Sequence, residues 1–85
     1  MATVDKKKVL WREVADQTVI LRMETGFSYS LDGAARLIWS GVVMGKSSEE
    51  IAAELSRAYA IDERTSKQDV QAFLEDLCKE GLIDP

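Results

Sequence analysis

Residues 26–39 pass from a strand-like to a helix-like hydrophobic pattern with no loop between the two. The segment reads GFSYSLDGAARLIW. Apolar residues first recur at every second position, up to Leu31, as in a strand with one buried face. From Gly33 onward they recur at helical spacing. Asp32 stands at the junction, where its carboxylate is expected to accept the first free helical N–H groups as an N-cap. The pattern predicts a strand that runs directly into a helix.

Two more strands are predicted before this segment. Lys8–Ala15 alternates in hydrophobicity, and Thr18–Glu24 is rich in β-branched and large apolar residues. The third strand is Phe27–Leu31, and Thr25-Gly26 before it is typical of a two-residue hairpin turn. Links as short as these join neighbouring antiparallel strands. The three segments therefore predict a three-stranded antiparallel sheet.

Two helices are predicted to follow the sheet. The first covers Gly33–Val43 and ends at Gly45, because glycine readily adopts the left-handed conformation that stops a helix. The second covers Ser48–Tyr59. It is preceded by a capping box, in which Ser47 and Glu50 each satisfy a main-chain N–H group of the other.

A third helix is predicted over Lys67–Glu80. Ser66, with Asp69 three residues later, is a second capping signal, which leaves Ala60–Thr65 as a polar connector. Gly81 ends the helix. The residues expected to point inward are Val70, Phe73, Leu74 and Leu77. Three strands followed by three α-helices predict one α+β domain, winged helix-turn-helix-like, over residues 1–85.

The chain lacks the residues that most enzymes and metal sites use. It contains no histidine and a single cysteine, Cys78. Histidine is the commonest general base and metal ligand, and one cysteine can form neither an internal disulfide nor a multi-cysteine metal site. We therefore expect no catalysis, no metal and no cofactor, and we interpret Cys78 as a buried structural thiol.

Apolar runs such as residues 37–39 and 42–44 are far too short to cross a bilayer. The lysines at positions 6–8 lead into an alternating, charged segment rather than into the apolar core of a signal peptide. We therefore expect a cytoplasmic protein with no membrane partner.

The charge distribution argues against a nucleic-acid partner. The net charge is −4, and residues 37–85 carry five basic and ten acidic groups. A winged helix could bind DNA and regulate transcription, with the third helix as its recognition helix. That helix, Lys67–Glu80, has two lysines against four carboxylates, which would repel phosphate. A DNA-binding domain is therefore the less favoured alternative.

The order of these elements and the residues at their boundaries form a pattern that extends from about Val9 to Ile83. The positions concerned are Val19-Ile20-Leu21, Gly26, Tyr29, Leu31-Asp32, Ala35, Ile38-Trp39, Glu50-Ile51, Leu55, Tyr59, Ile61-Asp62, Asp69-Val70, Phe73-Leu74, Leu77 and Gly81-Leu82-Ile83. They resemble the PqqD-like family, whose founding member acts in pyrroloquinoline quinone (PQQ) biosynthesis. The same fold is called the RiPP recognition element in pathways for ribosomally made, modified peptides, lasso peptides among them. Ser28 and Asp32 depart from the commonest family pattern, which leaves the subfamily and its peptide open.

The resemblance implies a non-catalytic adaptor, or peptide chaperone, that binds the leader of a precursor peptide. The leader would add as a strand beside the third strand and lie in a groove made with the third helix. The adaptor would present it to a separate modifying enzyme, such as a radical SAM enzyme or a leader peptidase. The peptide-binding residues implied are Phe27, Ser28, Tyr29, Ser30 and Leu31 in the strand, and Lys67, Val70, Gln71, Leu74, Leu77 and Cys78 in the helix.

Several of these residues also have a purely structural interpretation. Alternation favours Phe27 and Tyr29 as core residues beneath the sheet, with the two serines on the opposite face. The helix stripe that contains Leu74 and Cys78 is mixed in polarity, so it is either one wall of a groove or an ordinary boundary face. The sequence also leaves open which main-chain groups of the third strand face outward.

Overall fold

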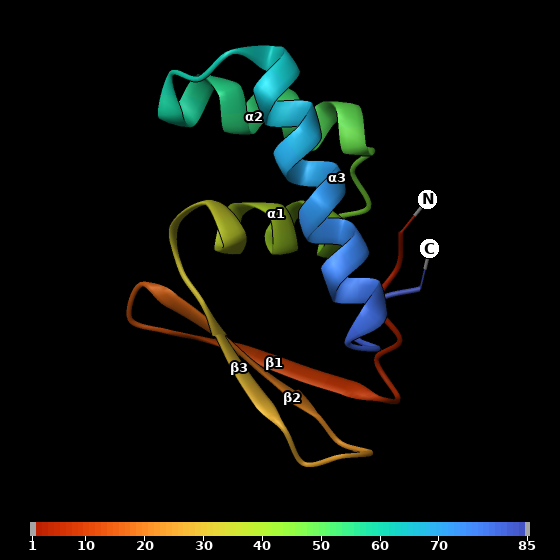
Figure 1. Cartoon of the computed structure of the whole chain (residues 1–85). Helices are drawn as coiled ribbons and strands as arrows, with labels where there is room; N and C mark the ends of the chain where they lie inside the picture. Colours follow the sequence, from red (N-terminus) through yellow and green to blue (C-terminus); the bar gives the residue numbers. More distant parts are fainter. Residues whose placement is uncertain (1, 85) are drawn as a thin grey trace.

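Three antiparallel strands are followed by three helices in the computed structural model, which describes residues 2–84 (Figure 1). The sheet, in the order β1-β2-β3, consists of β1 (Val9–Val14), β2 (Gln17–Arg22) and β3 (Ser28–Leu31). The helices are α1 (Gly33–Val43), α2 (Ser48–Tyr59) and α3 (Glu63–Lys79). This architecture confirms the α+β class and is compatible with the winged helix-turn-helix description.

The sheet buries one face only. Ile20 of β2 pairs with Trp11 of β1 and with Tyr29 of β3, so these three side chains share a face. The helices lie on that side of the sheet (Figure 1). Ile20 is fully buried, whereas Leu10 and Leu21, on the opposite face, are exposed. The strands match the prediction in number and order, with ends shifted by one or two residues.

Trp39 of α1 lies at the centre of the core and is 1% exposed. Its ring meets that of Trp11 in a T-shaped arrangement, with the ring centroids 5.6 Å apart. Ile51 and Leu55 of α2 and Val70 of α3 belong to the same buried cluster. Because edge-to-face aromatic pairs and buried apolar area both favour folding, this cluster fixes α1 against the sheet.

The joint between β3 and α1 is as short as the sequence predicted. Asp32 alone separates the two elements and is the N-cap residue of α1. Its main-chain carbonyl accepts the N–H of Arg36 at 3.3 Å. Within the described chain, however, its side chain makes no capping hydrogen bond, so the expected carboxylate cap is wrong. Gly33 has a φ of 51°, so the first turn departs from the regular geometry that an N-cap side chain needs.

The predicted capping box opens α2. The Glu50 N–H donates to Ser47 Oγ at 3.1 Å, and the Ser47 N–H donates to Glu50 Oε1 at 3.0 Å. The Glu50 carboxylate accepts hydrogen bonds from the main chain and then from the side chain of Ser47, and these hold the pKa of Glu50 below its ordinary value. Further along α2, Ile51 and Leu55 are buried, whereas Tyr59 in the last turn is 47% exposed. The capping box thus sets the start of the helix as expected.

One turn before the predicted start at Lys67, α3 begins at Glu63. Its N-cap is Asp62, whose carboxylate accepts the N–H of Thr65 at 3.2 Å. Ser66 is not a cap: it is fully buried, and its hydroxyl donates to the main-chain carbonyl of Ala52 in α2 at 2.5 Å. The connector before α3 is therefore shorter than predicted. Asp62 is the N-cap, and the hydroxyl of Ser66, which was expected to be the cap, makes a tertiary contact with α2 instead.

The described segments before β1 and after α3 meet beside the C-terminal end of α3 (Figure 1). Gly81, with a φ of 73°, ends the helix, and the N–H of Leu82 donates to the carbonyl of Leu77 at 2.9 Å. This is a Schellman-type closure, and it confirms Gly81 as the residue that ends the helix. Thr3 and Asp84 then form an antiparallel bridge with N–O distances of 3.0 and 2.8 Å. This bridge joins the segment after α3 to the segment before β1.

Candidate functional site

The outer edge of β3 is open. Within the described chain β3 pairs with β2 alone. The N–H of Arg22 donates to the carbonyl of Phe27 at 2.9 Å, which marks that pair as hydrogen-bonded. Hydrogen-bonded pairs alternate along an antiparallel ladder, so the main chain of Tyr29 faces β2. The N–H and C=O groups of Ser28 and Ser30 therefore point outward, which answers the question that the sequence left open.

The side chains of β3 divide between the two faces of the sheet. Tyr29 and Leu31 lie on the helix side and are half-buried against the core, while Ser28 and Ser30 are exposed on the other side. Phe27 precedes the strand and is 63% exposed. The expectation that it fills the core is wrong, because it belongs to the β2–β3 turn, which projects beyond the helices (Figure 1).

One flank of α3 faces the open edge. The hydroxyl of Tyr29 donates to Glu80 Oε2 at 3.0 Å, just beyond the last residue of α3. Residues four and seven positions earlier share that flank of a helix, which places Asp76 and Phe73 on it. Desolvation, and then the hydrogen bond to Glu80, raise the pKa of Tyr29 above its ordinary value. The surface between β3 and this flank carries Tyr29, Leu31, Phe73, Asp76 and Glu80, and it is where the groove was expected from the sequence.

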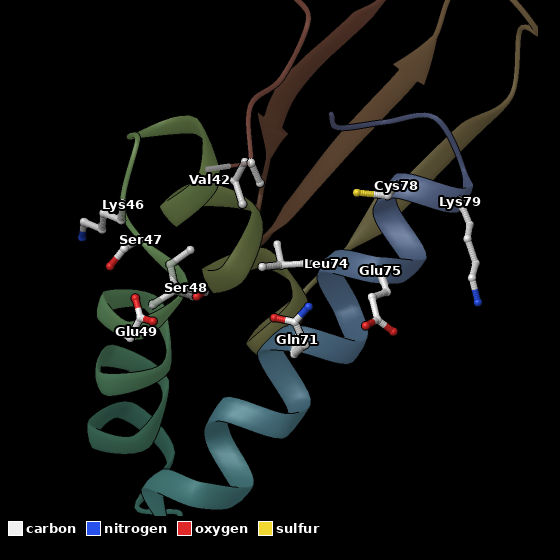
Figure 2. A pocket seen from close by; sticks show the side chains of 12 residues that line it. Val42, Lys46, Ser47, Ser48, Glu49, Gln71, Leu74, Glu75, Cys78 and Lys79 are labelled. Carbon is white, nitrogen blue, oxygen red and sulfur yellow. The ribbon is translucent and has the colours of Figure 1, made fainter. Parts of the chain in front are cut away.

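The opposite flank of α3 borders a separate cavity of about 650 Å³ (Figure 2). Val42 of α1 and the segment 46–49 line its other side, and Leu74 and Cys78 point into it. Leu74 lies roughly 120° around the helix from Glu80, at about 100° per residue. The stripe that contains Leu74 and Cys78 does line a cavity, but this cavity lies on the flank of α3 that faces away from β3.

The expected peptide-binding residues of α3 fall into three groups. Gln71, Leu74 and Cys78 line the cavity, and Lys67 joins Gln71 in a smaller hollow against the start of α2. Val70 and Leu77 are only 1% and 3% exposed, so they belong to the core. Cys78 is half-buried rather than fully buried. Asp76 and Glu80, on the β3 side, were not among the residues expected from the sequence, although their four-residue spacing places them on one side of a helix.

The chain matches the family model of coenzyme PQQ synthesis protein D (PqqD) over residues 17–83. It belongs to the PqqD family. The matched region runs from the start of β2 to Ile83, so it includes both β3 and α3. The family resemblance seen in the sequence is confirmed.

Two solved structures share this PqqD-family fold over nearly the whole chain. One is TbiB1 in complex with the TbiA(beta) leader peptide: the TM-score is 0.89 and the identity 29%, over 96% of this chain and 94% of that chain. The other is lasso peptide synthetase B1 complexed with the leader peptide: the TM-score is 0.89 and the identity 20%, over 99% of this chain and 98% of that chain. At 20% identity the second shows the fold alone. No curated protein matches the chain as a relative.

The described part of this PqqD-family chain offers no obvious place for a metal. Within residues 2–84, no group of three or more His, Cys, Asp and Glu side chains is placed to hold a metal ion. Over the same residues, no helix combines the length and apolar character needed to span a bilayer. The two flanks of α3 thus differ, because one borders the open edge of β3 and the other borders the cavity.

Proposed function

We propose that this PqqD-family chain binds the leader region of a ribosomally made precursor peptide. The observation that carries the proposal is its likeness, over nearly the full length of both chains, to a protein whose structure contains a leader peptide, at 29% identity. The open edge of β3 supplies a physical means of binding, because an extended peptide can add to an unpaired strand.

The incoming peptide adds as a fourth strand beside β3. It exchanges main-chain hydrogen bonds with Ser28 and Ser30, whose N–H and C=O groups point outward. Alternate peptide side chains then face the groove between β3 and α3, where Tyr29 and Phe73 offer half-buried aromatic surface. Main-chain bonds supply affinity in this mode, and the groove supplies specificity.

The protein acts in this proposal as an adaptor without chemistry of its own. It presents the bound leader, in the cytoplasm, to a separate modifying enzyme such as a radical SAM enzyme or a leader peptidase. The absence of histidine supports this role, since Cys78 then has no imidazole base to activate it. In the alternative role, α3 would read DNA. The carboxylates of Asp69, Asp76 and Glu80, on one flank of that helix, disfavour contact with phosphate.

The sharpest test of strand addition changes one main-chain donor. Proline lacks an N–H group and is tolerated on an edge strand where that group faces solvent. Ser30→Pro should therefore keep the β2–β3 ladder and remove a single hydrogen bond to the peptide. Ser30→Ala is the matched control, because it removes the hydroxyl and keeps the N–H.

The measurement is fluorescence anisotropy with a labelled synthetic leader of the precursor peptide encoded beside this chain, together with thermal melts. Ser30→Pro should weaken binding about fivefold or more, and Ser30→Ala should bind as the parent does. A folded Ser30→Pro variant with parental affinity, or a parent chain that does not bind the leader, would contradict the proposal.

A further inference from the structure

The face of the sheet that points away from the helices is apolar and uncovered. It carries Leu10, Arg12 and Val14 of β1 and Val19 and Leu21 of β2, which the strand register places on one side. We call these five residues the outer sheet face. Leu10 is 52% exposed, Val14 48% and Leu21 37%. The face is also hollowed, because these residues line a shallow depression of about 600 Å³. In Figure 1 no described element lies on this side of the sheet.

The charge of the outer sheet face is opposite to that of the whole protein. Arg12 is its one charged residue, and Lys8, two positions before Leu10, extends the same side of β1. None of the outward-pointing strand residues is a carboxylate. Within residues 2–84 no carboxylate lies within ion-pair distance of Arg12, whereas Arg22 and Arg36 each have one. A chain of net charge −4 thus keeps, among the described residues, an unpaired cation in the middle of an exposed apolar sheet surface.

From this combination we infer that the outer sheet face docks a partner protein through an apolar patch that is rimmed by carboxylates. The partner is the enzyme that modifies or cleaves the bound peptide, and this identity rests on the proposed function above. An interface of this kind gains affinity from the apolar centre, while the charge pairs fix orientation and speed association.

Three features favour an enzyme over other occupants. Docking here leaves the groove free, and Ser28 lines the depression from β3, so a peptide strand beside β3 would run along the border of the docked surface. A second copy of the chain in two-fold symmetry would bring Arg12 near its own counterpart, where like charges repel. An anionic membrane would be repelled by the net charge of −4.

The test measures affinity for the purified peptidase or radical enzyme encoded beside this chain, by biolayer interferometry. Arg12→Glu and Leu10→Ser change the outer sheet face at exposed positions. Arg64→Glu, in the first turn of α3, and Met44→Ser, at the end of α1, make the same changes at exposed positions elsewhere. Each face variant should weaken enzyme binding at least about tenfold, and each control should stay within about twofold. Affinity for the leader should be the same for the parent and for all four variants.

The inference would be overturned if the parent chain did not bind the enzyme, or if the face variants bound it as tightly as the controls do. It would also be overturned if light scattering showed a dimer that Arg12→Glu dissociates, or if the parent bound phosphatidylglycerol vesicles and Arg12→Glu abolished that binding. If the parent does not bind the leader, that result contradicts the proposed function and not the docking surface, because leader binding is measured without the enzyme.

Discussion

The hydroxyl of Tyr29 donates a hydrogen bond of 3.0 Å to Oε2 of Glu80, which joins β3 to the end of α3 across 51 positions of the sequence. The contact identifies the flank of α3 that faces the open edge of the sheet. It also places two carboxylates at one end of the surface between β3 and α3, because Asp76 stands one turn from Glu80. The same helix therefore has two distinct flanks, one toward β3 and one toward the cavity behind it.

The Glu13 carboxylate couples the sheet to α1 in a pH-dependent way. Its Oε2 accepts the hydroxyl of buried Thr18 at 2.6 Å, and its Oε1 accepts Nε of Arg36 at 2.7 Å. The hydrogen bond from Thr18, and then that from Arg36, hold the pKa of Glu13 below its ordinary value of 4.5. The folded state thus favours the ionised form, so this stabilisation is present above pH 4.5 and is lost as pH falls through the lowered pKa.

We expect Glu13→Gln to lack this part of the acid sensitivity. Between about pH 7 and pH 3, the urea midpoint of unfolding should fall less for the variant than for the parent, because glutamine does not titrate. Glu24→Gln, at the β2–β3 turn, is the matched control and should lose stability as the parent does. An equal loss for Glu13→Gln and the parent would show that these hydrogen bonds do not link protonation to folding.

The buried hydroxyl of Ser66 should stabilise the contact between α2 and α3. Removing it in Ser66→Ala deletes the hydrogen bond to the Ala52 carbonyl, while alanine slightly favours the helix. Ser40→Ala, at an exposed position of α1, makes the same gain in helix propensity without losing a buried hydrogen bond. The free energy of unfolding should be lower for Ser66→Ala than for Ser40→Ala by about 1 kcal/mol. Equal stabilities from chemical denaturation would mean that the bond contributes nothing net.

Local signals in the sequence predicted most of the fold. The period change at Asp32, the capping box at Ser47 and the glycine stop at Gly81 each depend on neighbouring residues, and all three mark element boundaries in the structure. The start of α3 was misplaced because Asp62 and Ser66 are both good capping residues, one turn apart. Only the tertiary hydrogen bond from Ser66 to Ala52 distinguishes them.

The site was harder to predict than the fold. Helical spacing correctly grouped Leu74 with Cys78, but it does not say which element each stripe faces. That depends on how α3 crosses the sheet, which the contact between Tyr29 and Glu80 reveals. Phe27 was misassigned for a similar reason: alternation describes a strand, but coverage by the helices decides which of its residues are buried.

The last prediction asks which flank of α3 contacts the leader. Asp76 and Glu75 are adjacent, exposed and acidic, but Asp76 shares the β3 side with Glu80, whereas Glu75 lines the cavity. Asp76→Arg and Glu75→Arg therefore change the net charge equally and place the same long side chain on opposite flanks. Long-range electrostatic effects on the peptide should be similar for both, so a difference between them reports local contact.

We expect Asp76→Arg to weaken leader binding at least about tenfold, because the new side chain occupies the groove beside the added strand. Glu75→Arg should remain within about twofold of the parent. Leu74→Glu adds a second probe of the cavity: a leader bound there would lose about 2 kcal/mol on meeting an unpaired charge, whereas a leader bound beside β3 would lose little. Titration calorimetry with the synthetic leader, with thermal melts to verify folding, measures all three. If Glu75→Arg and Leu74→Glu weaken binding while Asp76→Arg does not, the leader lies in the cavity behind α3 and not in the groove beside β3.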